Sequence, residues 1–175
     1  MIPIVFEVPA GPVPREVLAD TWRWLRESFP GECGRMIEES PVDGGLYRAT
    51  LEIPVREGAY LLLLDALTAI NVWTRERASI HGYPFPSVYD GALTYEQEPP
   101  GFEIWATTPA LYARGVGDCE DIAADRAAEL QLAGIPARAV IRLEHRTAEG
   151  TFWHVLVKHP DGTLEDPCIA LGMRS

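Results

Sequence analysis

The sequence predicts a single α+β domain in which a helix beginning at Cys119 packs on an antiparallel sheet. Its 175 residues fit one domain, and a content of 47% hydrophobic and 23% charged residues is ordinary for a globular protein. Residues 118–132 have the composition and the stop signals of a helix. Three short strand patterns separated by turn signals follow this helix, which favours a sheet against which the helix can pack.

The first half of the chain has the patterns of alternating strands and helices. Residues 2–8 and 47–55 have strand patterns. Pro14 suits the first turn of a helix, and apolar residues recur at helical spacing from there to Phe29. Residues 59–77 are strongly apolar, which predicts a helix buried on most sides. Residues 84–109 contain five prolines and no long period, so we expect a loop with short strand pieces.

The helix that begins at Cys119 has recognisable signals at both ends. Asp118 suits the N-cap position, and Asp121, three residues later, has the spacing of a capping box with Asp in place of Glu. Gly134 and Pro136 then end the helix. These signals place the cysteine in the first turn, where unpaired backbone N–H groups favour negative charge.

Three strands are expected after the helix, and a turn sets the register of the last two. The strands are residues 137–144, 151–158 and 163–168, and Pro-Asp-Gly at residues 160–162 forms the turn. If glycine takes the left-handed position of a three-residue loop, Asp166 lies opposite Leu156 and shares the face of His154. A two-residue loop would instead place Asp166 opposite Val157, on the other face. The Pro-Asp-Gly chemistry favours the three-residue loop.

Composition excludes several classes of function. A net charge of −11, with 26 acidic and 15 basic residues, argues against a nucleic-acid partner. No apolar run is long enough to span a membrane, and the N-terminus lacks the features of a signal peptide, so a cytoplasmic location is expected. Three cysteines without a C-x-x-C pair predict free thiols in a reducing compartment.

Cys119 is the cysteine best placed for nucleophilic chemistry. The backbone N–H groups of its helix start could stabilise a thiolate and a developing oxyanion. Gly115 and Gly117 allow the backbone to approach closely just before it. The alternative is a small buried cysteine at a helix start, which is common. Nearby carboxylates raise a thiol pKa, so a cationic partner would have to overcome Asp118 and Glu120.

His154, in the middle of a strand, is the candidate partner of Cys119. A strand histidine by itself is more often a structural residue satisfied by a hydrogen bond. The register argument, however, brings Asp166 within reach of the same imidazole. The sequence therefore favours a Cys119–His154–Asp166 arrangement.

The residues quoted so far resemble the transglutaminase-like branch of the papain-like cysteine hydrolases. The motifs are Gly-Asp-Cys-Glu-Asp at 117–121, Ala-Gly-Ile-Pro-Ala-Arg at 133–138, Trp-His-Val at 153–155, Asp-Gly at 161–162 and Asp-Pro at 166–167. That branch includes bacterial and phage-encoded transglutaminase-like cysteine peptidases. The resemblance covers about residues 107–168 and implies a papain-like fold with a catalytic core at about 105–170. Residues 1–100 would be an N-terminal elaboration.

The resemblance implies that Cys119 is the nucleophile, His154 the general base and acid, and Asp166 the carboxylate that orients the imidazole. It further implies acyl transfer on a carboxamide or peptide bond of a protein or peptide substrate, without metal or organic cofactor. The family often has an upstream side chain that donates to the oxyanion hole, for which Trp105 and Trp73 are options here. A phage-encoded member could be associated with the virion.

Other functions stay open at this stage. A crosslinking transglutaminase would transfer the acyl group to an amine, and a non-catalytic transglutaminase-like module would serve binding or structure. A zinc site at Cys119, His154 and Cys168 lacks a fourth ligand and a close cysteine pair. Calcium binding by acids such as Asp118 and Glu120 is explained more simply by helix capping. Cys33 is interpreted as a bystander, and nothing in the sequence indicates the oligomeric state.

Overall fold

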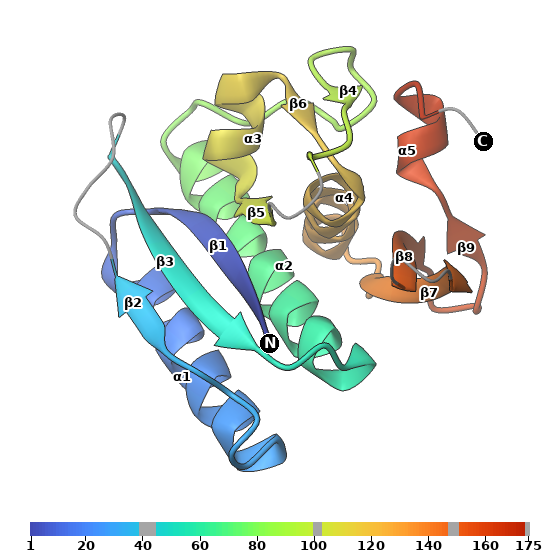
Figure 1. The fold of residues 1–175 in the computed structure, drawn as a ribbon. Coiled ribbons are helices and arrows are strands. Elements are labelled where there is room, and N and C mark those ends of the chain that lie inside the picture. The colour runs from blue at the N-terminus through green and yellow to red at the C-terminus, as the bar shows by residue number, and fades with distance from the viewer. Residues whose placement is uncertain (39–44, 100–102, 147–150, 174–175) are drawn as a thin grey trace.

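The protein has a mixed α+β architecture, and the part of the chain that the structure describes forms three separate sheets (Figure 1). The computed structural model describes residues 1–38, 45–99, 103–146 and 151–173. Within these ranges the strand orders are β2-β3-β1-β5, β4-β6 and β7-β8-β9. No helix in these ranges has the length and apolar character needed to cross a membrane.

The four-stranded sheet comes mainly from the N-terminal half. Its strands are β1 (Ile2–Pro9), β2 (Met36–Glu38), β3 (Leu46–Ile53) and β5 (Ile104–Ala106). β1 pairs antiparallel with β3, so that Ile4 lies opposite Leu51 and Phe6 opposite Ala49. These residues are fully buried, because alternate residues of both strands face one core. The two long strands confirm the predictions for residues 2–8 and 47–55.

Two helices fill the core beside this sheet. They are α1 (Pro12–Ser28) and α2 (Glu57–Ile80), and they contact each other. Both confirm the predicted helices, although each extends beyond the predicted bounds. α2 buries Leu63, Leu67 and Ile70 along most of its length, as its apolar composition predicts.

The proline-rich segment 84–109 contains short elements that lead into the site. β4 (Thr94–Tyr95) and β5 lie within its described part, and α3 (Thr108–Arg114), which was not predicted, begins at its end. β4 pairs in parallel with β6 (Val116–Gly117), which directly precedes the helix that begins at Cys119. Gly117 is required there, because a Cβ atom at this position would lie 2.4 Å from Cδ1 of the buried Leu111.

The helix α4 (Cys119–Leu132) lies between α2 and the sheet β7-β8-β9 (Figure 1). Nine of its 14 residues are buried, including the small Ala123 and Ala127 that permit close packing. A buried ion pair fixes it to α2, with 2.6 Å between Nη2 of Arg75 and Oδ2 of Asp125. The predicted packing of this helix on an antiparallel sheet is therefore present.

The C-terminal sheet confirms the predicted register but ends earlier than predicted. Its strands are β7 (Arg138–Arg146), β8 (Thr151–Lys158) and β9 (Leu164–Glu165). Val157 pairs with Glu165, and Gly162 has φ +88°, as the three-residue loop requires. The prediction of a strand through residue 168 was wrong, because Pro167 begins the short helix α5 (Pro167–Ala170). Asp166 therefore follows the strand and caps this helix.

Candidate active site

Cys119 and His154 line the same cavity, which has a volume of about 340 Å³. Cys119 is the first residue of α4 and is half-buried. His154 lies in the middle of β8 and is only 6% exposed. The cavity brings a thiol and an imidazole together from elements 35 positions apart in the sequence.

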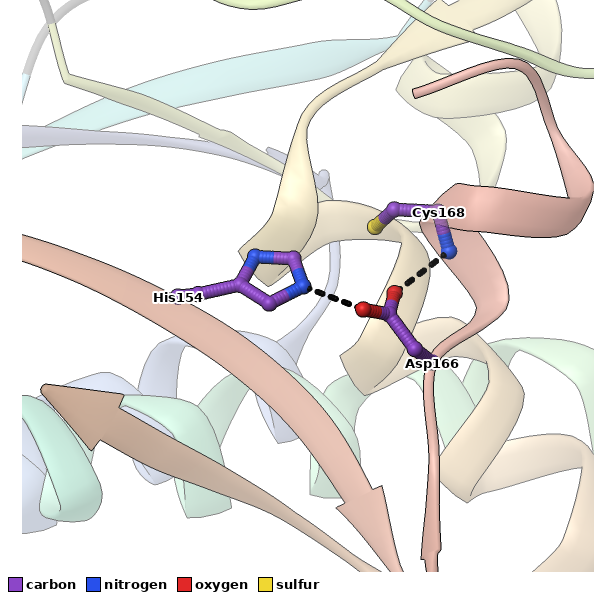
Figure 2. Close-up of side chains that lie close together, drawn as sticks. All are labelled: His154, Asp166 and Cys168. Carbon is purple, nitrogen blue, oxygen red and sulfur yellow. Dashed lines mark hydrogen bonds and ion pairs between the residues drawn. The ribbon is translucent and has the colours of Figure 1, made fainter. Parts of the chain in front are cut away.

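His154 and Asp166 are in direct contact. Nε2 of His154 lies 2.8 Å from Oδ2 of Asp166. The other carboxylate oxygen of Asp166 accepts a hydrogen bond from the backbone N–H of Cys168 at 3.1 Å, as Figure 2 shows. This second bond is the N-cap interaction of α5, so the helix start fixes the carboxylate that holds the imidazole. A carboxylate accepting from Nε2–H leaves Nδ1 of His154 as the basic ring nitrogen.

The thiol of Cys119 interacts with a carboxylate. It donates a hydrogen bond to Oε2 of Glu120, with 3.2 Å between the two atoms. Burial raises the pKa of Cys119 well above its usual value, and the charges of Glu120 and Asp118 raise it further. Among the described residues no hydrogen bond joins Cys119 to His154, so two of the three predicted site residues are in direct contact.

The acidic residues around Cys119 are not the helix caps that the sequence indicated. Asp118 occupies the N-cap position but makes no capping hydrogen bond. Asp121 accepts a hydrogen bond from the backbone N–H of Ala106 at 2.7 Å and so ties α4 to β5. The capping-box prediction was wrong, because Asp121 binds the backbone of β5 and Asp118 interacts with the Glu120 side chain instead of a backbone N–H of the first turn.

Two further acids in the cavity were missed by sequence reasoning. Glu98 accepts a hydrogen bond from the backbone N–H of Ile104 at 2.9 Å, and burial raises its pKa. Burial raises the pKa of Glu103 to about 7, and the charges of Glu120 and Glu98 add to the shift. Both lie in the proline-rich segment, which has no period from which their direction could be inferred.

The cavity also contains indole groups. Trp105 lines it and is almost fully buried, whereas Trp73 lies on α2 beside Arg77 and is not among the lining residues. Trp153 lines the cavity as well, and its buried Nε1 has no hydrogen-bond partner in the described part of the chain. Of the two tryptophans considered for the oxyanion hole, only Trp105 lines the cavity, and Trp153 is a lining tryptophan that was not considered.

Among the described residues, two clusters of side chains have ligand atoms close enough together to hold a metal ion. His154, Asp166 and Cys168 have ligand atoms within 4.8 Å of one another (Figure 2), and so do Glu98, Asp118 and Glu120. The first cluster has three ligands, one fewer than a structural zinc site, and two of them already share a hydrogen bond. Cys168, rather than Cys119, is the cysteine of this cluster, and burial raises the pKa of its thiol.

Cys33 lies away from this site, in agreement with its interpretation as a bystander. It follows α1 and packs at the edge of the core beside the four-stranded sheet. It is not among the residues that line the cavity of Cys119.

Comparisons of the chain with models of known protein families, with curated proteins and with solved structures found no match. The resemblance to transglutaminase-like hydrolases therefore rests on the local sequence motifs.

Proposed function

We propose that the protein catalyses thiol-dependent acyl transfer on a carboxamide or peptide bond, as a transglutaminase-like cysteine hydrolase with Cys119, His154 and Asp166 as its catalytic residues. The observation that carries the proposal is the His154–Asp166 hydrogen bond of 2.8 Å in the cavity that Cys119 lines. A carboxylate on Nε2 fixes the tautomer in which Nδ1 can accept a thiol proton.

In the proposed reaction, His154 Nδ1 takes the proton of the Cys119 thiol as the sulfur attacks the carbonyl carbon. The backbone N–H groups of the first turn of α4 stabilise the oxyanion. The imidazolium then gives its proton to the departing amine, and a thioester remains on Cys119. Water attacks this thioester with His154 again as the base, which releases the acid and restores the thiol.

The thiol must leave Glu120 for this reaction to occur. Its raised pKa means that it is neutral in the free protein, so His154 acts as a general base on a thiol and is not part of a preformed ion pair. Hydrogen bonds of catalytic groups often form only when the substrate is bound. Rotation of the thiol from Oε2 of Glu120 toward His154 is the movement that the proposal requires.

The hydrogen bond between the Cys119 thiol and Glu120 favours a second candidate function, a binding domain without catalysis. A neutral thiol held by a carboxylate is unreactive, and the acids beside it could serve a ligand instead. The two functions differ in whether a covalent intermediate forms on Cys119.

A library of acylated dipeptides that carry an aminocoumarin amide tests the proposal. Turnover is expected for the wild type and should fall by about 10³-fold or more in Cys119→Ala and His154→Gln. Cys33→Ala is the matched control, because it removes a free thiol outside the cavity and should leave the rate unchanged.

Ethanolamine added to the same assay separates hydrolysis from amine transfer. Mass spectrometry of the product shows the free acid if water resolves the thioester, or the ethanolamide if the amine does. Absence of turnover across the library, or equal turnover by Cys119→Ala, would contradict the proposed catalysis and leave the binding domain.

A further inference from the structure

The cavity beside Cys119 is acidic. Four carboxylates line it, and no lysine or arginine is among the described residues that do so. The four are Glu98, Glu103, Asp118 and Glu120. The four acids come from two parts of the chain. Glu98 and Glu103 lie in the proline-rich segment, and Asp118 and Glu120 are the neighbours of Cys119 in the sequence.

Three acids with little exposure elsewhere in the described part of the protein have arginine partners, whereas the buried Asp121 accepts a backbone hydrogen bond instead. Asp125 pairs with Arg75 at 2.6 Å, and Glu165 pairs with Arg126 at 2.8 Å. Glu7 pairs with an arginine as well, at 2.8 Å. Within the ranges that the structure describes, no ion pair joins a lysine or arginine to any of the four cavity acids. A buried carboxylate without a cationic partner is unfavourable, and a bound cation would relieve this cost.

Asp118 gives a second, independent indication of a ligand. The residue is only 8% exposed, and its buried Oδ1 atom has no hydrogen-bond partner in the described part of the chain. One of its carboxylate oxygens lies within 4.8 Å of oxygens of both Glu98 and Glu120. The side chain is therefore directed into the acid cluster, where it interacts with the Glu120 side chain while its Oδ1 atom lacks a donor.

The walls of the cavity suit an organic cation better than a metal ion. Tyr60, Trp105 and Trp153 line it, and aromatic faces attract guanidinium and ammonium groups. A volume of about 340 Å³ is in the range of sites for small organic molecules and far exceeds the volume of a single ion. Glu120 Oε2 already accepts the thiol hydrogen, and Glu98 Oε2 accepts a backbone hydrogen.

We propose that the substrate of this protein carries a guanidinium or ammonium group, as in an arginine or lysine side chain, which binds between the cavity acids and the aromatic walls. That the bound molecule is a substrate rests on the proposed function. That the cavity binds a cationic group rests on the cavity alone. A cation at this place would also offset the negative charges that act on Cys119.

Binding to the folded Cys119→Ser variant tests the inference without any need for catalysis. The ligands are acetyl-arginine amide and acetyl-citrulline amide, which have nearly the same shape but differ in charge, and calorimetry measures both. The arginine amide is expected to bind about tenfold more tightly or better, since charge-assisted hydrogen bonds exceed neutral ones. Glu103→Gln and Glu98→Gln, each added to the serine variant, should remove most of this preference.

Glu16→Gln is the matched control, because it makes the same charge change on the exposed face of α1. It should leave the preference unchanged, and circular dichroism of each variant establishes that it is folded. Equal affinity for the two amides, including no binding of either, would overturn the inference. Calcium chloride that binds to the cluster while the arginine amide does not would overturn it too.

Turnover separates this inference from the proposed function. A preference for the arginine amide without any hydrolysis by the wild type would contradict the proposed catalysis but support the proposed cation-binding site. Hydrolysis of arginine and citrulline substrates with equal kcat/KM would support the proposed catalysis but contradict the proposed cation-binding site.

Discussion

The thiol of Cys119 donates a hydrogen bond to the carboxylate of Glu120, with 3.2 Å between Sγ and Oε2. This contact joins the two features of the site that bear most on its function, the nucleophile and the acidic cavity. The start of α4 is a favourable place for a thiolate, but the carboxylates beside it have the opposite effect. Burial and the charges of these acids raise the pKa of Cys119 well above its usual value.

Replacement of Glu120 by Gln should lower the pKa of the Cys119 thiol, because it removes the negative charge next to it. Alkylation of Cys119 by iodoacetamide, a neutral reagent, should then be faster near neutral pH than in the wild type. The measurement is the rate of labelling against pH, with the labelled cysteine located by mass spectrometry. Labelling of Cys33 in the same samples is the internal control, and an unchanged profile at Cys119 would show that Glu120 does not control the thiol.

Asp166→Asn should retain the fold and reduce turnover by about 10²- to 10⁴-fold, because an amide cannot stabilise the imidazolium of His154. The amide oxygen can still accept the capping hydrogen bond from Cys168 N–H, so α5 should remain in place. Kinetics and thermal unfolding of Asp166→Asn are compared with those of Asp166→Ala, which loses the cap as well. Full activity of the asparagine variant would remove Asp166 from the mechanism.

The ion pair between Arg75 and Asp125 should be essential for stability. Arg75→Met leaves a buried carboxylate without its partner and should reduce the free energy of unfolding by about 3–5 kcal/mol. Arg138→Met is the matched control, because it breaks the exposed pair with Asp65 and should change the free energy by about 1 kcal/mol or less. Urea unfolding measures both, and equal effects would contradict the structural role of the buried pair.

Glu103 should make stability depend on pH in a defined direction. Its pKa of about 7 in the folded protein exceeds that of an ordinary glutamate, so the folded state binds the proton more tightly than the unfolded state. The stabilisation from this proton is complete below the unfolded pKa of about 4.3 and is lost as the pH rises through about 7. Glu103→Gln should remove this part of the pH dependence.

The check on Glu103 is a difference between two proteins. Urea unfolding of the wild type and of Glu103→Gln is measured at several pH values, and the stability of the wild type relative to the variant should fall as the pH rises. A relative stability that stays constant or rises over this range would show that the Glu103 carboxyl does not have a raised pKa.

The pairing of His154 with Asp166 was accessible from the sequence because one turn determines it. Pro-Asp-Gly at residues 160–162 favours a three-residue loop, and that loop fixes the register of β8 and β9. The end of β9 was predicted wrongly. Asp166 and Pro167 have the N-cap and first-turn signals of a helix start, which α5 uses, but the strand pattern before them was extended past this point.

The acidic character of the cavity could not be predicted to the same extent. Asp118 has the sequence signal of an N-cap, and only the surrounding fold turns its carboxylate toward the cavity instead. Glu98 and Glu103 belong to a segment without periodicity, so their side-chain directions depend on long-range contacts such as the pairing of β5 with β1. The hydrogen bond of the thiol to Glu120, by contrast, joins neighbouring residues of one helical turn.

The most direct test of the central claim is detection of an acyl group on Cys119 during turnover. The wild type is mixed with an excess of an acyl-arginine aminocoumarin amide, quenched in acid and digested, and the thioester is located by mass spectrometry. The account predicts an acyl group on Cys119 alone, a coumarin burst of about one equivalent per protein, and neither in Cys119→Ser. Coumarin release without an acylated Cys119, or acylation of Cys33 or Cys168 instead, would contradict it.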